Sequence, residues 1–341
     1  MSRDNKTSFA NAIELAISLK MAEDENVIIF GEDVELLRVN LFTRFGKHRV
    51  RNTPISESAF LGAAVTAAMS GLRPIVEIML VDFIGVCADG LLNHAAKIKF
   101  FSGGDWNVPL VVRTSCGGGY GDGGQHEQSL WGWLAHIPGL NVVVPSNPSD
   151  AAGLMVSAIE HNDPVVYFEH KLLTDYWLDY LGIGNRKSVS FDVPEKGAFG
   201  EIDEDVEIDG TPFGELNVIK EGRDITIVSV GVGVHRALEA AGILEKENIS
   251  AEVLDLRSIV PIDLQGINRS VEKTGVLVVV DEDYEQFGLS GEISALLLEL
   301  GLDFKFGRVC TTGTIPFNRI REDATLPNVS RIVRLCKDLI S

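Results

Sequence analysis

The chain has 341 residues, of which 45% are hydrophobic, and its acidic residues outnumber the basic ones by 49 to 30, for a formal net charge of -19. This length and composition suffice for two ordinary domains, each with its own core. The negative charge would repel nucleic acid and anionic lipid, so we expect a soluble protein that binds neither and whose partners are other proteins.

The four cysteines, Cys87, Cys116, Cys310 and Cys336, are far apart and form no CxxC pair. This spacing argues against a zinc site or a disulfide framework and is typical of a reducing compartment. No stretch approaches the ~18 to 20 apolar residues that a membrane span requires, and residues 1–18 lack the apolar core of a signal peptide. The sequence therefore predicts a cytoplasmic protein.

The first half of the chain alternates between helical and strand patterns. Phe9, Ile13, Ala16 and Ile17 share one face of a helix predicted at 8–21, and a short apolar run at 27–30 predicts a buried strand. Further helices are predicted at 59–69, 89–99 and 150–160, and further strands at 74–80, 108–113, 142–144 and 165–168. Continuous apolar strands between helices indicate a parallel sheet that is covered on both faces.

The alternation stops at about residue 173 and returns at about residue 217. The intervening stretch is charged and has no sustained helical period, so it predicts a linker or an excursion between domains. Strands are then predicted at 225–230, 251–254 and 276–280, and helices at 237–245 and 288–300. We therefore predict two doubly wound α/β domains, at 1–185 and 217–341, joined by residues 186–216.

A first candidate site residue is Glu57, in the segment Asn52-Thr-Pro-Ile-Ser-Glu57. Pro54 should end the preceding strand and Ser56 can cap the next helix, which places Glu57 in the first helical turn. On the residues alone, this arrangement is explained more simply by a favourable acid near the helix dipole. The functional alternative is that Glu57, beside an apolar Ile55, hydrogen-bonds a buried heterocyclic nitrogen.

A second candidate is His126, which closes a glycine-rich segment that begins at Cys116. Six glycines, at 117, 118, 119, 121, 123 and 124, are too costly for the interior of a helix or a strand, so they predict a loop. Its backbone can approach a ligand or another chain closely, and it follows a predicted strand, where α/β proteins build their sites. A loop histidine titrates near neutrality and can move protons, although many loop histidines have no such role.

Three other motifs have simpler interpretations. Gly121-Asp-Gly123 resembles the start of a diphosphate-and-magnesium motif, but the downstream Asn147, before a proline, fits that motif badly. The segment 231–236 has two glycines of a dinucleotide fingerprint, with Arg236 where the third glycine belongs. We expect the acidic run at 281–285 to be a solvated loop or a docking patch rather than a metal cluster.

The order of motifs resembles the E1β family, the β subunits of thiamine-diphosphate-dependent E1 components, over nearly the whole chain. The matching stretches are FGED at 30–33, TPISE at 53–57, GLRPIVE at 71–77, DF at 82–83, AAK at 95–97, QH at 125–126 with Gln128, AHIPGL at 135–140, VPS at 144–146, EVLDLRS at 252–258 and KTG at 273–275. Within the family, DFIGVC at 82–87, GGGY at 117–120 and VDEDYE at 280–285 look most like acetoin dehydrogenase β subunits.

The resemblance implies a pyrimidine-binding α/β domain followed by a transketolase C-terminal-like domain. It also implies a separate α subunit that holds the diphosphate and Mg²⁺, an α₂β₂ heterotetramer with thiamine diphosphate at the α/β interface, and a lipoyl-bearing E2. The implied reaction cleaves acetoin or decarboxylates a 2-oxoacid and reductively acylates the lipoyl group. The alternatives are a pyruvate or branched-chain 2-oxoacid enzyme, a non-catalytic scaffold that docks E2, and a stand-alone nucleotide-binding module.

Carried onto matching positions, the resemblance gives roles to five residues. Glu57 would bind N1′ of the aminopyrimidine, Phe83 would pack against that ring with Ile55 beside it, and His126 would face the reactive carbon. Met79 stands where many 2-oxoacid dehydrogenases have glutamine in the substrate pocket, which favours a less polar substrate such as acetoin.

The resemblance also implies a structural potassium site at Leu110, Ala158, Ile159 and Asp163. His161 stands there in place of a usual aspartate. Main-chain carbonyls can still bind a cation, but a protonated imidazole would oppose it.

Overall fold

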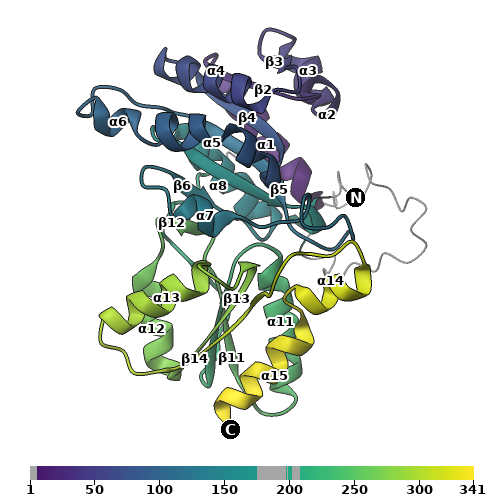
Figure 1. Ribbon diagram of the computed structural model, residues 1–341, viewed down its shortest axis with the longest axis vertical. Helices are drawn as coiled ribbons and strands as arrows, with labels where there is room; N and C mark the ends of the chain where they lie inside the picture. The colour runs from purple at the N-terminus through teal and green to yellow at the C-terminus, as the bar shows by residue number, and fades with distance from the viewer. Residues whose placement is uncertain (1–5, 175–196, 198, 202–207) are drawn as a thin grey trace, which may run out of the picture.

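The computed structural model describes residues 6–174, 197, 199–201 and 208–341, so most of the predicted linker at 186–216 lies outside the described residues. The described chain has two main sheets, one built mostly from each half, with helices on both faces (Figure 1). The predicted α/β class is confirmed. Within the described residues, no helix is both long and apolar enough to cross a membrane.

The first sheet has seven strands in the order β12-β6-β7-β5-β4-β2-β3. Their bounds are β2 (Val27–Gly31), β3 (Val50–Asn52), β4 (Arg73–Leu80), β5 (Val111–Cys116), β6 (Asn141–Val143), β7 (Val165–His170) and β12 (Ser258–Val260). All pairs are parallel except β12 with β6. Since β12 comes from the second half of the chain, the two halves share this sheet.

Alternating side chains of β2 pack against two different helical layers, as the two faces of a strand require. Val27 and Ile29 join the cluster built around α1 (Phe9–Glu23) and α8 (Pro148–Glu160). Ile28 and Phe30 join the cluster that contains α4 (Glu57–Met69), α5 (Ile84–Asp89) and α7 (Trp131–Ala135). The short helices of this half are α2 (Val34–Leu37), α3 (Val39–Phe45), α6 (Ile98–Phe101), and η1 (Val81–Phe83) and η3 (Lys171–Leu173), which are 3₁₀.

The second sheet has five strands in the order β14-β13-β10-β11-β9. Their bounds are β9 (Asn217–Lys220), β10 (Ile225–Ser229), β11 (Ala251–Asp255), β13 (Val276–Tyr284) and β14 (Lys305–Thr311), and only β9 is antiparallel. The helices are α11 (Val232–Glu245), α12 (Leu264–Thr274), α13 (Leu289–Glu299), α14 (Arg319–Thr325) and α15 (Val329–Ile340). A short antiparallel pair, β1 (Lys6–Ser8) with β8 (Phe199–Glu201), completes the described strands.

Three predicted elements are wrong in detail. The helix predicted at 89–99 is broken into α5, a π-helical turn η2 (Gly90–Ala95) and α6. The strand predicted at 108–113 is β5, displaced toward Cys116, because Pro109 has no backbone N–H to donate to a neighbouring strand. The acidic run at 281–285 is not a solvated loop, because Asp281, Glu282 and Asp283 are buried in β13.

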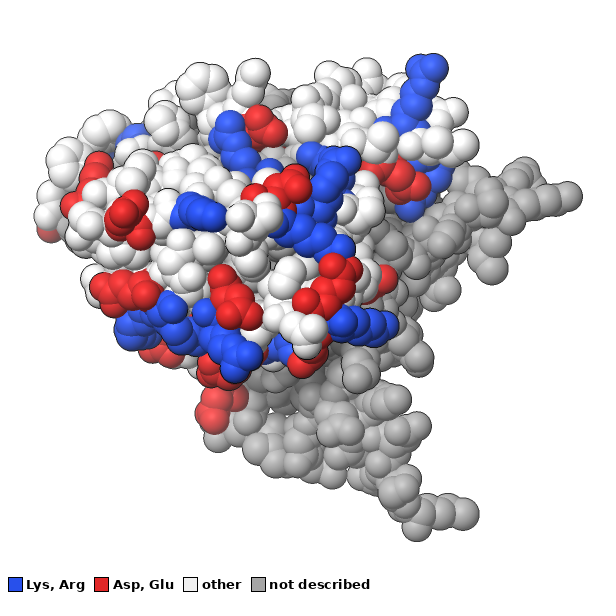
Figure 2. Space-filling model, turned by 90° about the horizontal axis from the view of Figure 1, so that it is seen from below, with Lys and Arg blue, Asp and Glu red and all other residues white. Residues whose placement is uncertain are grey.

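Figure 2 views the molecule from below, onto the second half of the chain, where Lys and Arg side chains interleave with Asp and Glu. In the second half of the chain, partly exposed charges pair across elements, as in Lys220 with Glu245 and Lys337 with Glu247. On the described part of this face the two signs are therefore mixed, and exposed pairs of this kind contribute little to stability.

Candidate active site

Three of the predicted site residues follow three strands of the first sheet. Glu57 comes after β3, Phe83 after β4, and His126 after the loop that leaves β5. The three strands run parallel, with β2 between β3 and β4. Their carboxyl ends therefore lie along the same edge of the sheet, which is where open α/β sheets bind ligands.

Glu57 is the first residue of α4 and is partly buried. The predicted cap is wrong, because the Ser56 side chain accepts no hydrogen bond from the helix. The Glu57 carboxylate itself makes no hydrogen bond or ion pair with any described residue. Burial and then the Glu57 charge raise the pKa of Cys87 to about 12, and Ser58 Oγ donates to the Val86 carbonyl at 2.6 Å. The start of α4 therefore lies against α5.

A second carboxyl group lies close to Glu57. Burial, followed by the charges of Asp33 and Glu57, raises the pKa of Glu32, at the end of β2. Like charges at this separation favour the neutral form of one of them. This end of the sheet is therefore suited to a ligand that donates or exchanges a proton.

Phe83 and His126 come together, as the resemblance implies. Their rings meet edge to face with centroids 6.0 Å apart. The Cys87 thiol lies 3.9 Å from the Phe83 carbonyl, and the pKa of the same thiol is raised by burial and by the Glu57 charge. Phe83 therefore lies one helical turn from a residue close to Glu57. Ile55, two residues before Glu57, is 75% exposed. Phe83 and His126 thus form an aromatic pair near the carboxylate.

The loop that carries His126 approaches the second half of the same chain. A Cβ on Gly117 would lie 2.0 Å from Nε2 of His170, and its φ is +96°, so only glycine fits there. The Gly118 N–H donates to Oε1 of Glu282 at 2.8 Å. The Lys171 ammonium donates to the His126 carbonyl at 2.6 Å, and Gln128 bridges Asp82 and Tyr284. Because these partners are distant in sequence, motif reasoning missed them.

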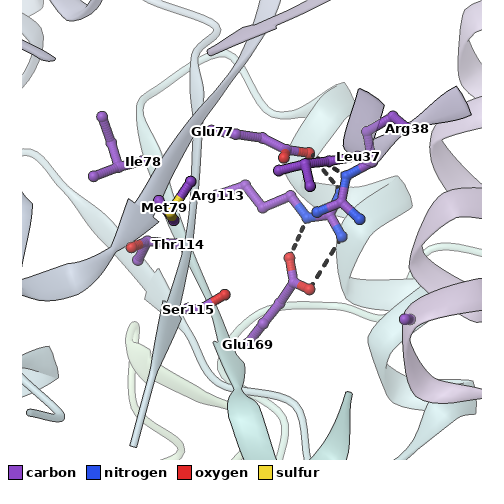
Figure 3. A pocket seen from close by; sticks show the side chains of 10 residues that line it. Leu37, Arg38, Glu77, Ile78, Met79, Arg113, Thr114, Ser115 and Glu169 are labelled. Atoms are coloured by element: carbon purple, nitrogen blue, oxygen red, sulfur yellow. Dashed lines mark hydrogen bonds and ion pairs between the residues drawn. The ribbon is translucent and has the colours of Figure 1, made fainter. Parts of the chain in front are cut away.

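Met79 lies beside a buried ion-pair network (Figure 3). Arg113 donates to Glu77 at 2.7 Å and to Glu169 at 3.0 Å, and Arg38 donates to Glu77 at 2.8 Å. The cavity between them has a volume of about 30 Å³, enough for one water molecule. Burial alone would raise the pKa of Glu77, but the two guanidinium groups outweigh it and hold that pKa below its usual value.

Met79 also touches the active-site region. It packs with Phe83 against a small apolar cluster of Leu80, Tyr120, Leu172 and Val232. The sequence contains one indication of the ion-pair network behind Met79. Arg113 lies inside a predicted buried strand, and a buried arginine requires a charged partner. Which carboxylates pair with Arg113 depends on the register of three neighbouring strands, which the pattern does not give.

The residues of the implied potassium site lie at the end of α8 and the start of β5. The Arg73 guanidinium donates to the carbonyl of Ile159 at 2.9 Å and to that of His161 at 3.1 Å. Lys99 Nζ contacts both carboxylate oxygens of Asp163, at 2.6 and 2.8 Å. Two cationic side chains therefore already occupy acceptors of this region. Among the described residues there is no group of three or more His, Cys, Asp or Glu that could hold a metal ion.

The second glycine of the segment 231–236 is explained by packing, and the first, Gly231, has a positive φ of +52°. A Cβ on Gly233 would lie 2.2 Å from Ser229 Oγ, so glycine allows α11 to approach β10 closely. Arg236 is buried and ion-paired with Glu282 at 2.5 Å. In the loop before His126, a Cβ on Gly123 would meet the Phe317 ring at 2.9 Å, which likewise gives this glycine a packing role.

The chain matches two family models and is similar to known proteins over almost its full length. Residues 5–175 match the transketolase pyrimidine binding domain, and residues 214–332 match the transketolase C-terminal domain. The β subunit of acetoin:2,6-dichlorophenolindophenol oxidoreductase from Bacillus subtilis (strain 168) is 41% identical, covering 98% of this chain and 97% of that one. The pyruvate dehydrogenase E1 component subunit β of Staphylococcus epidermidis (strain ATCC 35984) is 39% identical, covering 97% of each chain.

A solved structure, the split gene transketolase as an inactive β₄ tetramer, has a TM-score of 0.77 and covers 98% of each chain at 20% sequence identity. At this identity the likeness shows a shared fold. The resemblance drawn from the ordered motifs is thus confirmed by relatives that are themselves named as β subunits. The chain belongs to the E1β family, whose members join a transketolase pyrimidine-binding domain to a transketolase C-terminal domain and are associated with thiamine diphosphate.

Proposed function

We propose that this chain is the β half of a thiamine-diphosphate-dependent E1 enzyme and that an α subunit completes its active site. The observation that carries the proposal is Glu57, a partly buried carboxylate at the carboxyl edge of the first sheet that has no hydrogen-bond donor among the described residues. The names of its relatives, as β subunits of oxidoreductases, support the same reading.

The residues at this edge fit an aminopyrimidine. Glu57 offers a carboxyl group that can donate to N1′ when it is protonated or accept from N1′ when the ring carries the proton. Phe83 offers an aromatic face, and Ile55 offers exposed apolar surface. When bound, thiamine diphosphate supplies a nucleophilic thiazolium carbon and an electron sink for cleavage beside a carbonyl. The work of Glu57 is to exchange a proton with N1′, which an acid can do efficiently in a site from which water is largely excluded.

His126 is proposed to act on the substrate side of the same site. Its ring packs against Phe83, and Lys171 fixes its main chain. An imidazole there can donate a hydrogen bond to the oxygen derived from the substrate carbonyl, or assist acyl transfer to the lipoyl sulfur. We propose the lipoyl group of an E2 as the acceptor.

We propose that the α subunit holds the diphosphate and Mg²⁺ in an α₂β₂ heterotetramer in the cytoplasm. Gly121 and Gly123 have φ of +74° and +75° and pack near Phe317, so the Gly-Asp-Gly sequence is part of a loop built against its own chain. Because this Gly-Asp-Gly segment packs against its own chain, it supports the proposal that the α subunit, and not this chain, holds the diphosphate and Mg²⁺.

We propose acetoin as the substrate, and Met79 beside Phe83 supports a less polar pocket than a glutamine would give. The test reconstitutes the chain with its α subunit and compares turnover of acetoin, pyruvate and 3-methyl-2-oxobutanoate with an artificial electron acceptor. Acetoin should be turned over fastest. Faster turnover of pyruvate or the branched-chain acid would reassign the substrate, and failure of the complex to bind thiamine diphosphate would favour a scaffold that only docks E2.

At the implied potassium site, we propose weak binding at most. Arg73 and Lys99 already contact acceptors there, and His161 adds a third basic group. We expect equal unfolding temperatures in KCl and NaCl at the same ionic strength. If K⁺ were present at 100 times the Kd of a structural site, it would raise the free energy of unfolding by about 2.7 kcal/mol in KCl alone. A gain of that size would contradict the proposal.

A further inference from the structure

Two glutamates clamp the glycine loop that leads to His126. Glu127 accepts from the Tyr120 N–H at 2.7 Å through one oxygen and from the Gly123 N–H at 3.0 Å through the other. Glu322, on α14, accepts from the Gly119 N–H at 2.6 Å. The loop is therefore held by one carboxyl group from its own end and by one from the second half of the chain.

The two carboxyl groups are buried against each other. Glu127 and Glu322 are each 0% exposed, and their carboxyl groups lie close enough that Glu322 adds to the effect of burial in raising the pKa of Glu127. Two ionised carboxylates are both acceptors and would repel each other there, whereas an acid and a carboxylate can share a hydrogen bond, so we infer that the pair carries one proton. Burial of two like charges side by side would also be costly. The pair is therefore an acid–carboxylate bridge between α14 and the loop.

This bridge lies next to His126. Glu127 directly follows His126 in the chain, and Lys171, itself buried, donates to the His126 carbonyl at 2.6 Å. Lys171 also interacts electrostatically with Glu127. Any movement of Glu127 is therefore transmitted to the His126 main chain, and so to the ring that packs against Phe83.

We propose that Glu127 is a positioning residue for His126. Its protonated carboxyl group donates a hydrogen bond to Glu322 and so holds the loop in place. This inference rests on the proposed role of His126 in an E1 active site. Loss of the proton turns the bridge into two facing carboxylates and displaces the loop. The positive groups beside the pair are Lys171, which faces Glu127, and Arg319, which pairs with Glu322 at 3.2 Å. Asp122, in the loop, interacts with Lys171.

The pH at which the bridge breaks follows from these surroundings. Burial raises the pKa of Glu127 to about 8, with Lys171 opposing the shift and Glu322 reinforcing it. The bridge should therefore be intact at neutral pH and break in the alkaline range.

The decisive variant is Glu127→Gln, because an amide N–H₂ can donate to Glu322 as the protonated acid does but cannot ionise, although its single oxygen can accept from only one of the Tyr120 and Gly123 N–H groups. In the complex with the α subunit, the kcat/KM of the unmodified protein should fall on an alkaline limb centred near pH 8, by about tenfold one pH unit above the midpoint. Glu127→Gln should lose that limb, so that its kcat/KM relative to its own value at pH 7 stays level up to pH 9. The control Glu272→Gln, at an exposed position of α12, should keep it. An unchanged limb in Glu127→Gln would overturn the proposal.

Two readouts separate this inference from the proposed function. Because the folded pKa of Glu127 is raised, its contribution to stability is lost as pH rises toward about 8, so the urea midpoint of the full chain should fall from pH 6 to 9 in the unmodified protein and less in Glu127→Gln. The amide resonances of Tyr120 and Gly123, whose N–H groups donate to Glu127, should shift over the same range and change little in the variant. Both effects can be measured if the complex has no turnover, in which case the proposed function fails. Absence of both would overturn the acid bridge.

Discussion

Replacing Glu57 with glutamine should lower the turnover of the complex with the α subunit by about 10²–10⁴-fold, the range typical for loss of a group that transfers a proton. Glutamine keeps the size of the side chain and can still accept a hydrogen bond, but it cannot exchange a proton with N1′. Because the Glu57 carboxylate makes no hydrogen bond or ion pair with any described residue, the substitution should leave the fold of the chain intact.

The measurement is single-turnover and steady-state kinetics, with assembly followed by sedimentation. The matched control is Glu239→Gln, an exposed glutamate on α11 that loses the same charge far from the strand ends. Glu57→Asp should retain part of the activity, since it keeps an ionisable group one methylene shorter. Near-normal turnover in Glu57→Gln with an intact tetramer would refute the role of Glu57 and with it the proposed chemistry.

Much of the fold could be predicted because the local pattern and the tertiary environment agree. Phe9, Ile13 and Ile17 recur at helical spacing and are fully buried in α1. The apolar run of β2 is buried on both sides, as an interior parallel strand should be. Glu57 at the start of α4 and His126 at the end of a loop also follow from the nearby Pro54 and the run of glycines, although the predicted cap by Ser56 does not form.

What could not be predicted depends on partners that are distant in the chain. The run from Asp281 to Asp283 is as acidic as a surface loop, yet it is buried because Trp131, His170 and the Gly132 N–H supply donors from the first half of the chain. Glu127 was not singled out for the same reason. Its buried state depends on Glu322, which follows it by almost two hundred residues.

The Glu282 carboxylate joins the two halves of the chain, and its replacement by glutamine should cost about 3–5 kcal/mol of unfolding free energy, the usual cost of breaking a buried ion pair. It accepts from His170 at 2.7 Å, from Arg236 at 2.5 Å and from the Gly118 N–H at 2.8 Å. An amide cannot balance Arg236, which would then be a buried charge without its partner carboxylate. The exposed pair of Lys220 with Glu245 offers the control, and Glu245→Gln should cost less than about 1 kcal/mol.

The pH dependence of stability gives Glu282 a second signature. Burial opposes its ionisation, but His170 and Arg236 outweigh burial and hold the pKa of Glu282 far below its usual value. The Glu282 carboxylate therefore contributes to the free energy of unfolding above the pKa of an unfolded glutamate, and this contribution is lost as the pH falls below that pKa. Urea unfolding at pH 7 and pH 4 should show a larger acid loss in the unmodified chain than in Glu282→Gln. Asp281 and Asp283, whose pKa values are raised to about 6 and about 8, act in the opposite direction in both proteins. Because the Glu282 charge adds to burial in raising the pKa of Asp281, the difference between the two proteins reports Glu282 together with its effect on Asp281, and equal acid losses would contradict a stabilising role of this carboxylate at the junction.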